Sequence, residues 1–366
     1  MVWRWRAITA VRDLEEWFDT ARLGFKREYG LLGRLEILPY RGHGTDRRLF
    51  LRGRVLEEKG ITPSMHDDTV WENLRNMVRR FASDEVAGAR VRATFRGVEA
   101  RAVADEEGFF DVALDLAAPP DGPDYWHAIE LELLHPDSPG SGPVRSTGQA
   151  LVPSRARFAV ISDLDDTVVR SSATNVLKMV WIVLRNNAHT RLPFPGVAAF
   201  YEALRRGPDD GLDNPVFYVS SSPWNLYDLL EDFLDVHGVP AGPLFLKDWS
   251  PTTLGRHHDH KLGIIRTLLR TYPDLPFVLI GDSGEEDPEI YYQAVVEHPG
   301  RVEAIFIRDV TSAERDAEVR KIAERMAPLG ASMFAVADSA TAAEHAVSLG
   351  LIRPEAVQHV RAARDR

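Results

Sequence analysis

The sequence predicts an α/β fold with a parallel sheet in its second half, preceded by an N-terminal helix and a β-sandwich. Two observations lead to this expectation. From residue 154 onward, near-continuous apolar runs alternate with helical patterns, as in a parallel sheet that helices cover on both faces. Between residues 35 and 153, short segments instead alternate apolar and polar residues with period two, which is typical of antiparallel strands.

Three segments follow from this change of pattern. They are a helical segment over 1–34, a β-sandwich domain with a helical insertion over 35–153, and an α/β domain over 154–366. Apolar residues of the first segment recur at the helical period. The segment also carries Trp3 and Trp5 beside arginines, which is compatible with a membrane interface, but packing against the next domain is the preferred interpretation.

The middle segment contains three clear alternating runs, at 91–95, 110–116 and 129–133, separated by turn signals. Several short antiparallel strands at such spacing suggest a β-sandwich. Apolar residues between Val70 and Phe81 fall on one helical face and predict the insertion. Gly42-His43-Gly44 lies in no strand–loop–helix context, so a turn is preferred to a ligand site. No catalytic constellation is evident in this segment.

The composition and net charge of the chain exclude several classes of function. The 366-residue chain is 44% apolar and 27% charged, as in globular proteins, and its net charge of −11 argues against a nucleic-acid binder with a broad basic surface. Without cysteine, disulfides, thiolate zinc sites and thiol catalysis are excluded. The N-terminus shows no signal peptide, and the apolar run Val180–Leu184 is too short to span a bilayer. A cytoplasmic protein is expected, with peripheral membrane contact left open.

The α/β segment has six apolar runs that predict strands, at 158–161, 216–219, 244–246, 277–280, 304–307 and 334–337. Ligands of parallel sheets bind at the carboxyl ends of the strands. The first run ends in Asp163-Leu-Asp165-Asp166-Thr167, a cluster of like charges that is costly to bury unless a cation or a reaction uses them.

These carboxylates suit phosphoryl transfer. Asp163 is the candidate nucleophile, and Asp165, on the same side of an extended strand end, is the candidate acid and base that protonates the leaving alkoxide and then deprotonates water. Asp166 points elsewhere and is interpreted as a structural partner or helix cap.

Two further residues are candidates for holding phosphate. Ser220 follows an apolar run and precedes Pro223, which marks a helix start, where a hydroxyl and free backbone N–H groups suit an anion. Taken alone, Ser220 to Ser222 are better explained as helix caps. Lys261 offers a compact charge for a phosphoryl oxygen and matters because it falls between the other motifs. Three histidines just before Lys261 could form a metal site. A polar loop is preferred, because no second cluster of ligand residues supports a metal.

The last motif, Gly281-Asp282-Ser-Gly-Glu-Glu-Asp287-Pro, follows the run 277–280. Hard oxygen ligands at a strand end suit Mg²⁺. Asp282 is expected to coordinate it with Asp163 and the backbone carbonyl of Asp165. Asp287 is expected to bind a metal-bound water or to orient the ligands. The two glutamates between them are ambiguous.

Over residues 155 to about 350, the ordered motifs resemble phosphatases of the haloacid-dehalogenase (HAD) superfamily. They are more closely similar to the phosphatidate phosphatase catalytic-domain family typified by the yeast actin patch protein and distantly related to lipins. The resemblance implies a Rossmann-like HAD domain and a Mg²⁺-dependent phosphatase that converts phosphatidate to diacylglycerol. By this resemblance, Asp163 is the nucleophile and Asp165 is the acid/base. Ser220 and Lys261 hold the phosphate, and Asp282 and Asp287 belong to the metal site. The stretches that carry it are Asp163–Ser171, Phe217–Trp224, His260-Lys261 and Ile280–Tyr291.

The main hypothesis is a Mg²⁺-dependent phosphomonoesterase with an aspartyl-phosphate intermediate, acting on phosphatidate or a related lipid phosphate. Two rivals are a phosphatase for a soluble phosphate metabolite and a non-catalytic lipid-phosphate-binding module. The intact pair Asp163 and Asp165 argues against the second rival. The apolar helix expected near 175–186 either contacts lipid or belongs to the core, and the sequence leaves both open.

Overall fold

The computed structural model describes residues 33–57, 85–120, 125–137, 142–164, 195–209, 211, 213–247, 257–310 and 313–365. The expected helices within 1–34, around 70–81 and near 175–186 lie outside these ranges, apart from residues 33 and 34. The chain divides into two compact units, Met1–Pro120 with Trp126–Ala150, and Asp121–Tyr125 with Leu151–Arg366. Each unit is described by itself.

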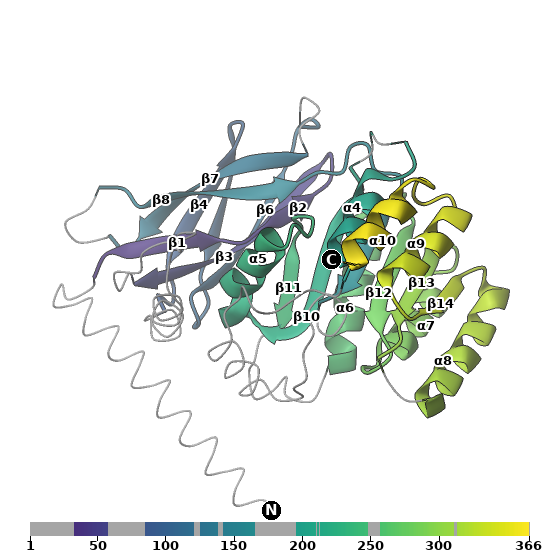
Figure 1. Cartoon of the computed structure of the whole chain (residues 1–366). Helices are drawn as coiled ribbons and strands as arrows, with labels where there is room; N and C mark the ends of the chain where they lie inside the picture. The colour runs from purple at the N-terminus through teal and green to yellow at the C-terminus, as the bar shows by residue number, and fades with distance from the viewer. Residues whose placement is uncertain are drawn as a thin grey trace, which may run out of the picture. The chain divides into compact units, whose positions relative to one another are not determined.

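The first unit contains an eight-stranded sheet (Figure 1). Its strands are β1 Leu35–Pro39, β2 Gly42–Gly44, β3 Arg48–Glu57, β4 Arg90–Phe95, β5 Val98–Val103, β6 Phe109–Asp115, β7 Trp126–His135 and β8 Arg145–Leu151. The order is β1-β3-β2-β8-β7-β4-β5, and β6 also pairs with β3. The pairings of β3 with β1, β2 and β6, and of β4 with β5 and β7, are antiparallel. Alternate residues of β6 and β7 are buried, as period-two patterning requires.

The second unit contains a six-stranded sheet in the order β11-β10-β9-β12-β13-β14, and every neighbouring pair is parallel. Its strands are β9 Ala159–Asp163, β10 Val216–Pro223, β11 Leu244–Lys247, β12 Phe277–Asp282, β13 Val302–Arg308 and β14 Ser332–Val336. From β9 the chain adds β10 and β11 on one side, then crosses over to add β12, β13 and β14 on the other. The carboxyl end of β9 is therefore the point where strand order reverses, which is where open parallel sheets bind ligands.

Helices cover both faces of this sheet. They are α4 Val197–Arg206, α5 Tyr227–Val236, α6 His257–Thr271, α7 Asp287–Glu297, α8 Ala313–Met326, α9 Ser339–Ser348 and α10 Ala356–Arg364, with 3₁₀ turns η2 Trp224–Leu226 and η3 Ala327–Leu329. In β10, Tyr218 stacks on Tyr201 of α4, whereas its neighbour Phe217 contacts Tyr272 just beyond α6. Because adjacent strand residues point to opposite faces, α4 and α6 lie on opposite sides of the sheet.

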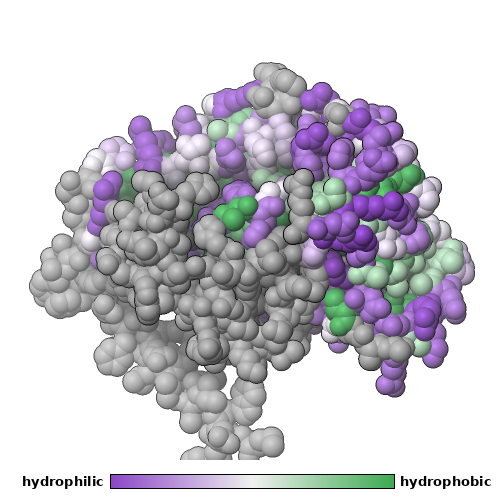
Figure 2. All heavy atoms as spheres, in the orientation of Figure 1, coloured by the Kyte–Doolittle hydropathy of each residue, from purple (hydrophilic) through white to green (hydrophobic). Residues whose placement is uncertain are grey.

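The strands that meet at the reversal point are the most deeply buried. Every residue of β9 and β12 is buried, which explains why both read as continuous apolar runs. The visible face of this unit is mainly hydrophilic with scattered apolar patches (Figure 2). Among the described residues, no helix is long and apolar enough to cross a membrane.

Candidate active site

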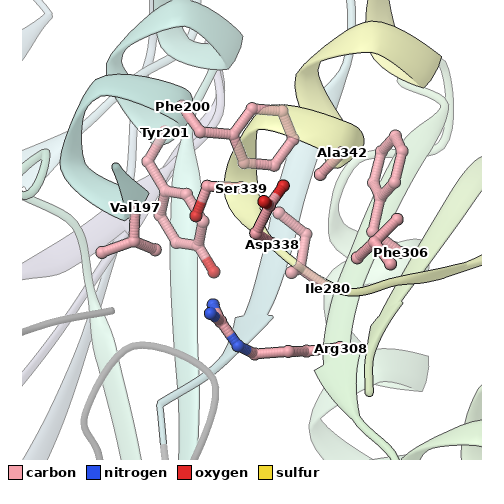
Figure 3. A pocket seen from close by; sticks show the side chains of 10 residues that line it. Val197, Phe200, Tyr201, Ile280, Phe306, Arg308, Asp338, Ser339 and Ala342 are labelled. Atoms are coloured by element: carbon pink, nitrogen blue, oxygen red, sulfur yellow. The ribbon is translucent and has the colours of Figure 1, made fainter. Parts of the chain in front are cut away.

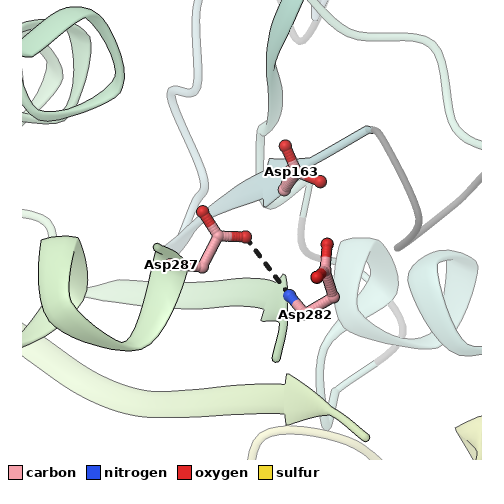
Figure 4. Close-up of side chains that lie close together, drawn as sticks. All are labelled: Asp163, Asp282 and Asp287. Carbon is pink, nitrogen blue, oxygen red and sulfur yellow. Dashed lines mark hydrogen bonds between the residues drawn. The ribbon is translucent and has the colours of Figure 1, made fainter. Parts of the chain in front are cut away.

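Three aspartates converge at the carboxyl ends of β9 and β12. Asp163 is the last residue of β9, Asp282 is the last residue of β12, and Asp287 is the first residue of α7. Each offers a carboxylate oxygen, and these atoms all lie within 4.8 Å of one another. All three side chains are buried (Figure 4). β9 and β12 are neighbours in the sheet, so the fold itself brings residues 119 positions apart in the chain (163 to 282) together.

Lys261 supplies the positive charge of this cluster. Its Nζ, from the second turn of α6, lies 2.7 Å from Asp163 Oδ1, 2.9 Å from Asp287 Oδ1 and 2.7 Å from Glu285 Oε2. Burial alone would lower the pKa of the ammonium, but the surrounding carboxylates raise that pKa well above its usual value. Lys261 therefore stays protonated. One ammonium does not balance three buried carboxylates, so the cluster favours a further cation.

The two oxygens of Asp282 have different surroundings. Oδ1 accepts hydrogen bonds from the backbone N–H groups of Gly284, at 2.6 Å, and Glu285, at 3.0 Å. Oδ2 is buried and has no hydrogen-bond partner within the described part of the chain. Burial, followed by the negative charges of Asp287 and Glu285, raises the pKa of Asp282 to about 7. Oδ1 thus fixes the loop, while Oδ2 is available to a cation.

Asp287 is held by two donors. Its Oδ1 accepts from Lys261 Nζ, and its Oδ2 accepts from the backbone N–H of Asp282 at 3.2 Å (Figure 4). Gly281 is required for this approach, because a Cβ there would collide with the Asp287 carboxylate. Burial raises the pKa of Asp287 even though Lys261 opposes the shift. Both carboxylate oxygens of Asp287 therefore accept a hydrogen bond within the cluster.

Ser220 lies in the strand next to Asp163. Asp163 pairs with Val219 of β10, and Ser220 follows it, fully buried, with Oγ accepting the Ser222 N–H at 3.0 Å. A helix was expected to begin at Pro223, but the first helical turn begins one residue later, at Trp224. β10 continues through Pro223, and the N-cap positions of η2 and α5 are Pro223 and Leu226. The serines therefore do not cap these helices.

Some predicted residues cannot be placed. Asp165, the expected acid and base, lies outside the described residues together with Asp166 and Thr167. The side chains of His257 and His258 lie outside them as well. Among the described residues, the cluster with metal-ligand spacing consists of the three aspartates and does not include His260.

Sequence reasoning did not identify Arg315, which fixes the loop after β12. This α8 side chain donates to the backbone carbonyls of Ser283 and Glu285, both at 3.1 Å, and forms a bidentate pair with Glu289 at 2.6 and 2.8 Å. No motif surrounds Arg315, and the helical pattern of α8 gives no sign of these contacts. The loop that carries Asp282 is thus held by Arg315 on one side and by Asp287 on the other.

A small, open pocket lies on the α4 and α9 face of the same sheet (Figure 3). Its walls are mostly apolar, with Arg308 at the end of β13 pointing towards the Tyr201 hydroxyl. Tyr201 Oη lies 2.7 Å from Ser162 Oγ, which in turn donates to the backbone carbonyl of Asp163 at 2.6 Å. Buried hydrogen bonds therefore connect the pocket wall to the backbone of Asp163.

Comparison with known proteins finds sequences similar to this segment of the chain. Residues 158–309 match the family described as the catalytic domain of phosphatidate phosphatase APP1. The chain is 29% identical over 192 residues to phosphatidate phosphatase APP1 of Saccharomyces cerevisiae, which covers 51% of this chain and 32% of that protein. It is 26% identical over 247 residues to an uncharacterized protein of Schizosaccharomyces pombe, covering 64% of this chain and 40% of that protein.

The chain thus spans about a third of the length of the S. cerevisiae protein that it matches. A solved structure, a carbohydrate acetylesterase from Xanthomonas citri, aligns over 80% of this chain and 66% of its own, with 12% identity and a TM-score of 0.30, too low to inform the fold. The matched segment contains Asp163, Ser220, Lys261, Asp282 and Asp287. Residues 158–309 of this chain are therefore similar to the phosphatidate phosphatase catalytic-domain family.

Proposed function

We propose that this protein is a Mg²⁺-dependent phosphatase that hydrolyses a phosphomonoester, with phosphatidate or a related lipid phosphate as substrate, through an aspartyl-phosphate intermediate. The observation that carries the proposal is the buried cluster of Asp163, Asp282 and Asp287 around Lys261 at the reversal point of the sheet. The strand order supports a Rossmann-like HAD fold for the second unit, and the antiparallel strands of the first support a β-sandwich.

The donor set fits Mg²⁺. Asp163 and Asp282 offer hard oxygen ligands at adjacent strand ends, and Oδ2 of Asp282 is buried without a hydrogen-bond partner in the described part of the chain. The backbone carbonyl of Asp165 would complete the protein ligands, with Asp287 orienting them. When bound, the ion would offset the negative charge of the carboxylates and of the developing phosphoryl transition state.

The chain's own residues divide the reaction into two steps. A carboxylate oxygen of Asp163 attacks phosphorus, the bond to the substrate oxygen breaks, and Asp165 protonates the leaving alkoxide. Asp165 then deprotonates a water that attacks the aspartyl phosphate, releasing inorganic phosphate and restoring Asp163. Ser220 and Lys261 hold phosphoryl oxygens during both steps, and Lys261, already 2.7 Å from Asp163, neutralises charge as it develops.

The substrate class is tested by comparing phosphate release from phosphatidate in mixed micelles with release from a soluble aryl phosphate, each with Mg²⁺ and with a chelator. The proposal predicts Mg²⁺-dependent release with preference for the lipid. Equal or better hydrolysis of soluble esters would instead indicate a metabolite phosphatase. Lipid binding without turnover under any divalent metal would indicate a non-catalytic binding module.

Replacing Arg315 with glutamine is expected to raise the Mg²⁺ concentration needed for half-maximal activity about tenfold, as is typical when a group that orients metal ligands is lost. The reason is that Arg315 fixes the loop carrying Asp282 through the carbonyls of Ser283 and Glu285. A Mg²⁺ titration of activity measures the effect, and Arg320→Gln, an exposed arginine of the same helix, is the control. An unchanged titration midpoint in Arg315→Gln would show that the loop does not depend on this contact.

In the metal-free protein, the raised pKa of Asp282 is expected to make the free energy of unfolding fall as pH rises. The pKa of its carboxyl is about 7 in the folded protein against an ordinary value of 3.8, so the folded state binds this proton more tightly than the unfolded state. The resulting stabilisation is complete below about pH 4 and is lost as pH rises through about 7. Relative to Asp282→Asn in a chelator, the free energy of unfolding should fall by roughly 4 kcal/mol between pH 4 and 8.

Urea unfolding of the wild type and Asp282→Asn at both pH values gives this difference. Mg²⁺ should restore the stability of the wild type at pH 8, because the ion binds the ionised carboxylate of the folded state. A difference that does not change with pH would contradict the raised pKa.

A further inference from the structure

Lys247 ends β11, the edge strand on one side of the parallel sheet. Its place relative to the site follows from strand register, in which Asp163 pairs with Val219 and Val219 pairs with Phe245. Lys247 lies two residues beyond Phe245 and pairs with Pro223. It therefore lies at the carboxyl edge of the sheet, two strands from Asp163 and two residues farther along the strand direction.

Lys247 also lies on the face of the sheet that carries the aspartate cluster. Phe245 contacts Phe217, and Phe217 contacts Tyr272 at the end of α6, so these rings mark the α6 face. The irregularity in the pairing places the extra residues in β10 rather than β11. Alternation along β11 therefore directs Lys247 to the same face as Phe245. Lys261, which contacts Asp163, comes from α6 on this same face.

Lys247 is more buried than most lysines, because the residue as a whole is only 3% exposed. Its Nζ is not among the fully buried atoms that lack a hydrogen bond, and no ion pair or hydrogen bond joins it to another residue of the described part of the chain. Burial lowers the pKa of its ammonium. A lysine that buries its stem and keeps its charged end at the surface can present that charge to an anion. The position therefore suits contact with an anion that arrives from outside the chain.

The length of the lysine side chain indicates which part of the substrate the Lys247 ammonium would contact. Neighbouring strands are about 4.8 Å apart, so Lys247 is displaced about 10 Å sideways and about 7 Å outwards from Asp163. A lysine side chain extends about 6 Å. Lys247 thus reaches the space in front of Asp163, where the substrate phosphate would lie, but does not reach the Asp163 carboxylate. Lys261 is already paired with Asp163 and Asp287.

We propose that Lys247 is a substrate-binding residue whose ammonium contacts an anionic phosphate oxygen of the phosphomonoester, in addition to Lys261. This inference rests on the phosphatase function proposed above. It makes Lys247 a determinant of substrate affinity rather than of the chemical step, because its contact exists before and after transfer to Asp163.

The test compares Lys247→Met with Lys247→Arg, using Lys321→Met, an exposed lysine of α8, as the matched control. Lys247→Met should raise KM about tenfold with kcat within twofold, and Lys247→Arg should recover part of the loss. The Kd of inorganic phosphate, measured by calorimetry on the Mg²⁺-supplemented full chain, should rise by a similar factor. Lys321→Met should behave as the wild type in both measurements.

Folding is checked by thermal unfolding, in which Lys247→Met should be about as stable as the wild type because methionine keeps most of the buried stem of the lysine. If Lys247→Met does not fold, Lys247→Gln is judged by the same criteria. Unchanged KM and unchanged phosphate Kd, or a loss confined to kcat, would overturn the inference.

Failure of the phosphatase proposal would be recognised separately, as absence of phosphate release by the wild type. Phosphate binding then decides the role of Lys247. Weaker binding to Lys247→Met than to the wild type supports the role, and equal binding, or no binding to the wild type, overturns it.

Discussion

Replacing Asp163 with asparagine is expected to abolish phosphate release, lowering kcat at least about 1,000-fold, because the amide cannot form the phosphoryl bond. The substitution keeps the size and shape of the side chain at a position that is only 1% exposed. It also removes one negative charge from a cluster whose carboxylates already repel one another. The folded structure should therefore survive, so the loss of activity reports on the chemistry.

The control for Asp163→Asn is Asp274→Asn, an exposed aspartate in the turn after α6 that should keep full activity. Phosphate release from lipid and aryl esters is measured for both variants, with thermal unfolding as the check on folding. Undiminished turnover by Asp163→Asn would reject Asp163 as the nucleophile.

Replacing Lys261 with methionine is expected to have the second-largest effect, on both stability and activity. Its ammonium contacts Asp163, Asp287 and Glu285 at 2.7 to 2.9 Å while being only 2% exposed. Removing one partner from such a buried set leaves uncompensated charge and costs about 3–5 kcal/mol. Loss of a cation aimed at the transferring phosphoryl group should also lower kcat about 100-fold or more.

Denaturant unfolding and steady-state kinetics measure these two effects, with Lys321→Met as the control for losing an exposed lysine. Mg²⁺ should recover part of the stability of Lys261→Met, because the ion offsets the same carboxylates. Activity within a few-fold of the wild type would show that Lys261 only balances charge in the free protein.

The strands of the parallel sheet could be predicted from the sequence because they are buried on both faces of the sheet. The apolar runs before Asp163 and Asp282 are continuous, and the parallel strands β9 and β12 end at those residues. Parallel strands place their carboxyl ends at one edge, so two distant acidic motifs could be expected to meet there. The neighbouring pair β9 and β12 meets that expectation.

Other features depend on tertiary contacts that local patterns do not encode. Pro223 predicted a helix start, but pairing with β11 continues the strand through this residue. The role of Arg315 arises from how α8 packs near the loop after β12, which no motif records. The burial of Lys247 likewise depends on the fold, because a lysine after Leu-Phe-Leu is ordinarily an exposed strand end.

Chemical trapping of the intermediate tests the central claim most directly. The wild-type protein would be mixed with phosphatidate and Mg²⁺, quenched during turnover and reduced with borohydride, which converts an aspartyl phosphate to homoserine. Mass spectrometry of the peptide containing Asp163 is predicted to show homoserine at that position, and Asp163→Asn should show none. Steady phosphate release with an unmodified Asp163, or modification of a different carboxylate, would contradict the account.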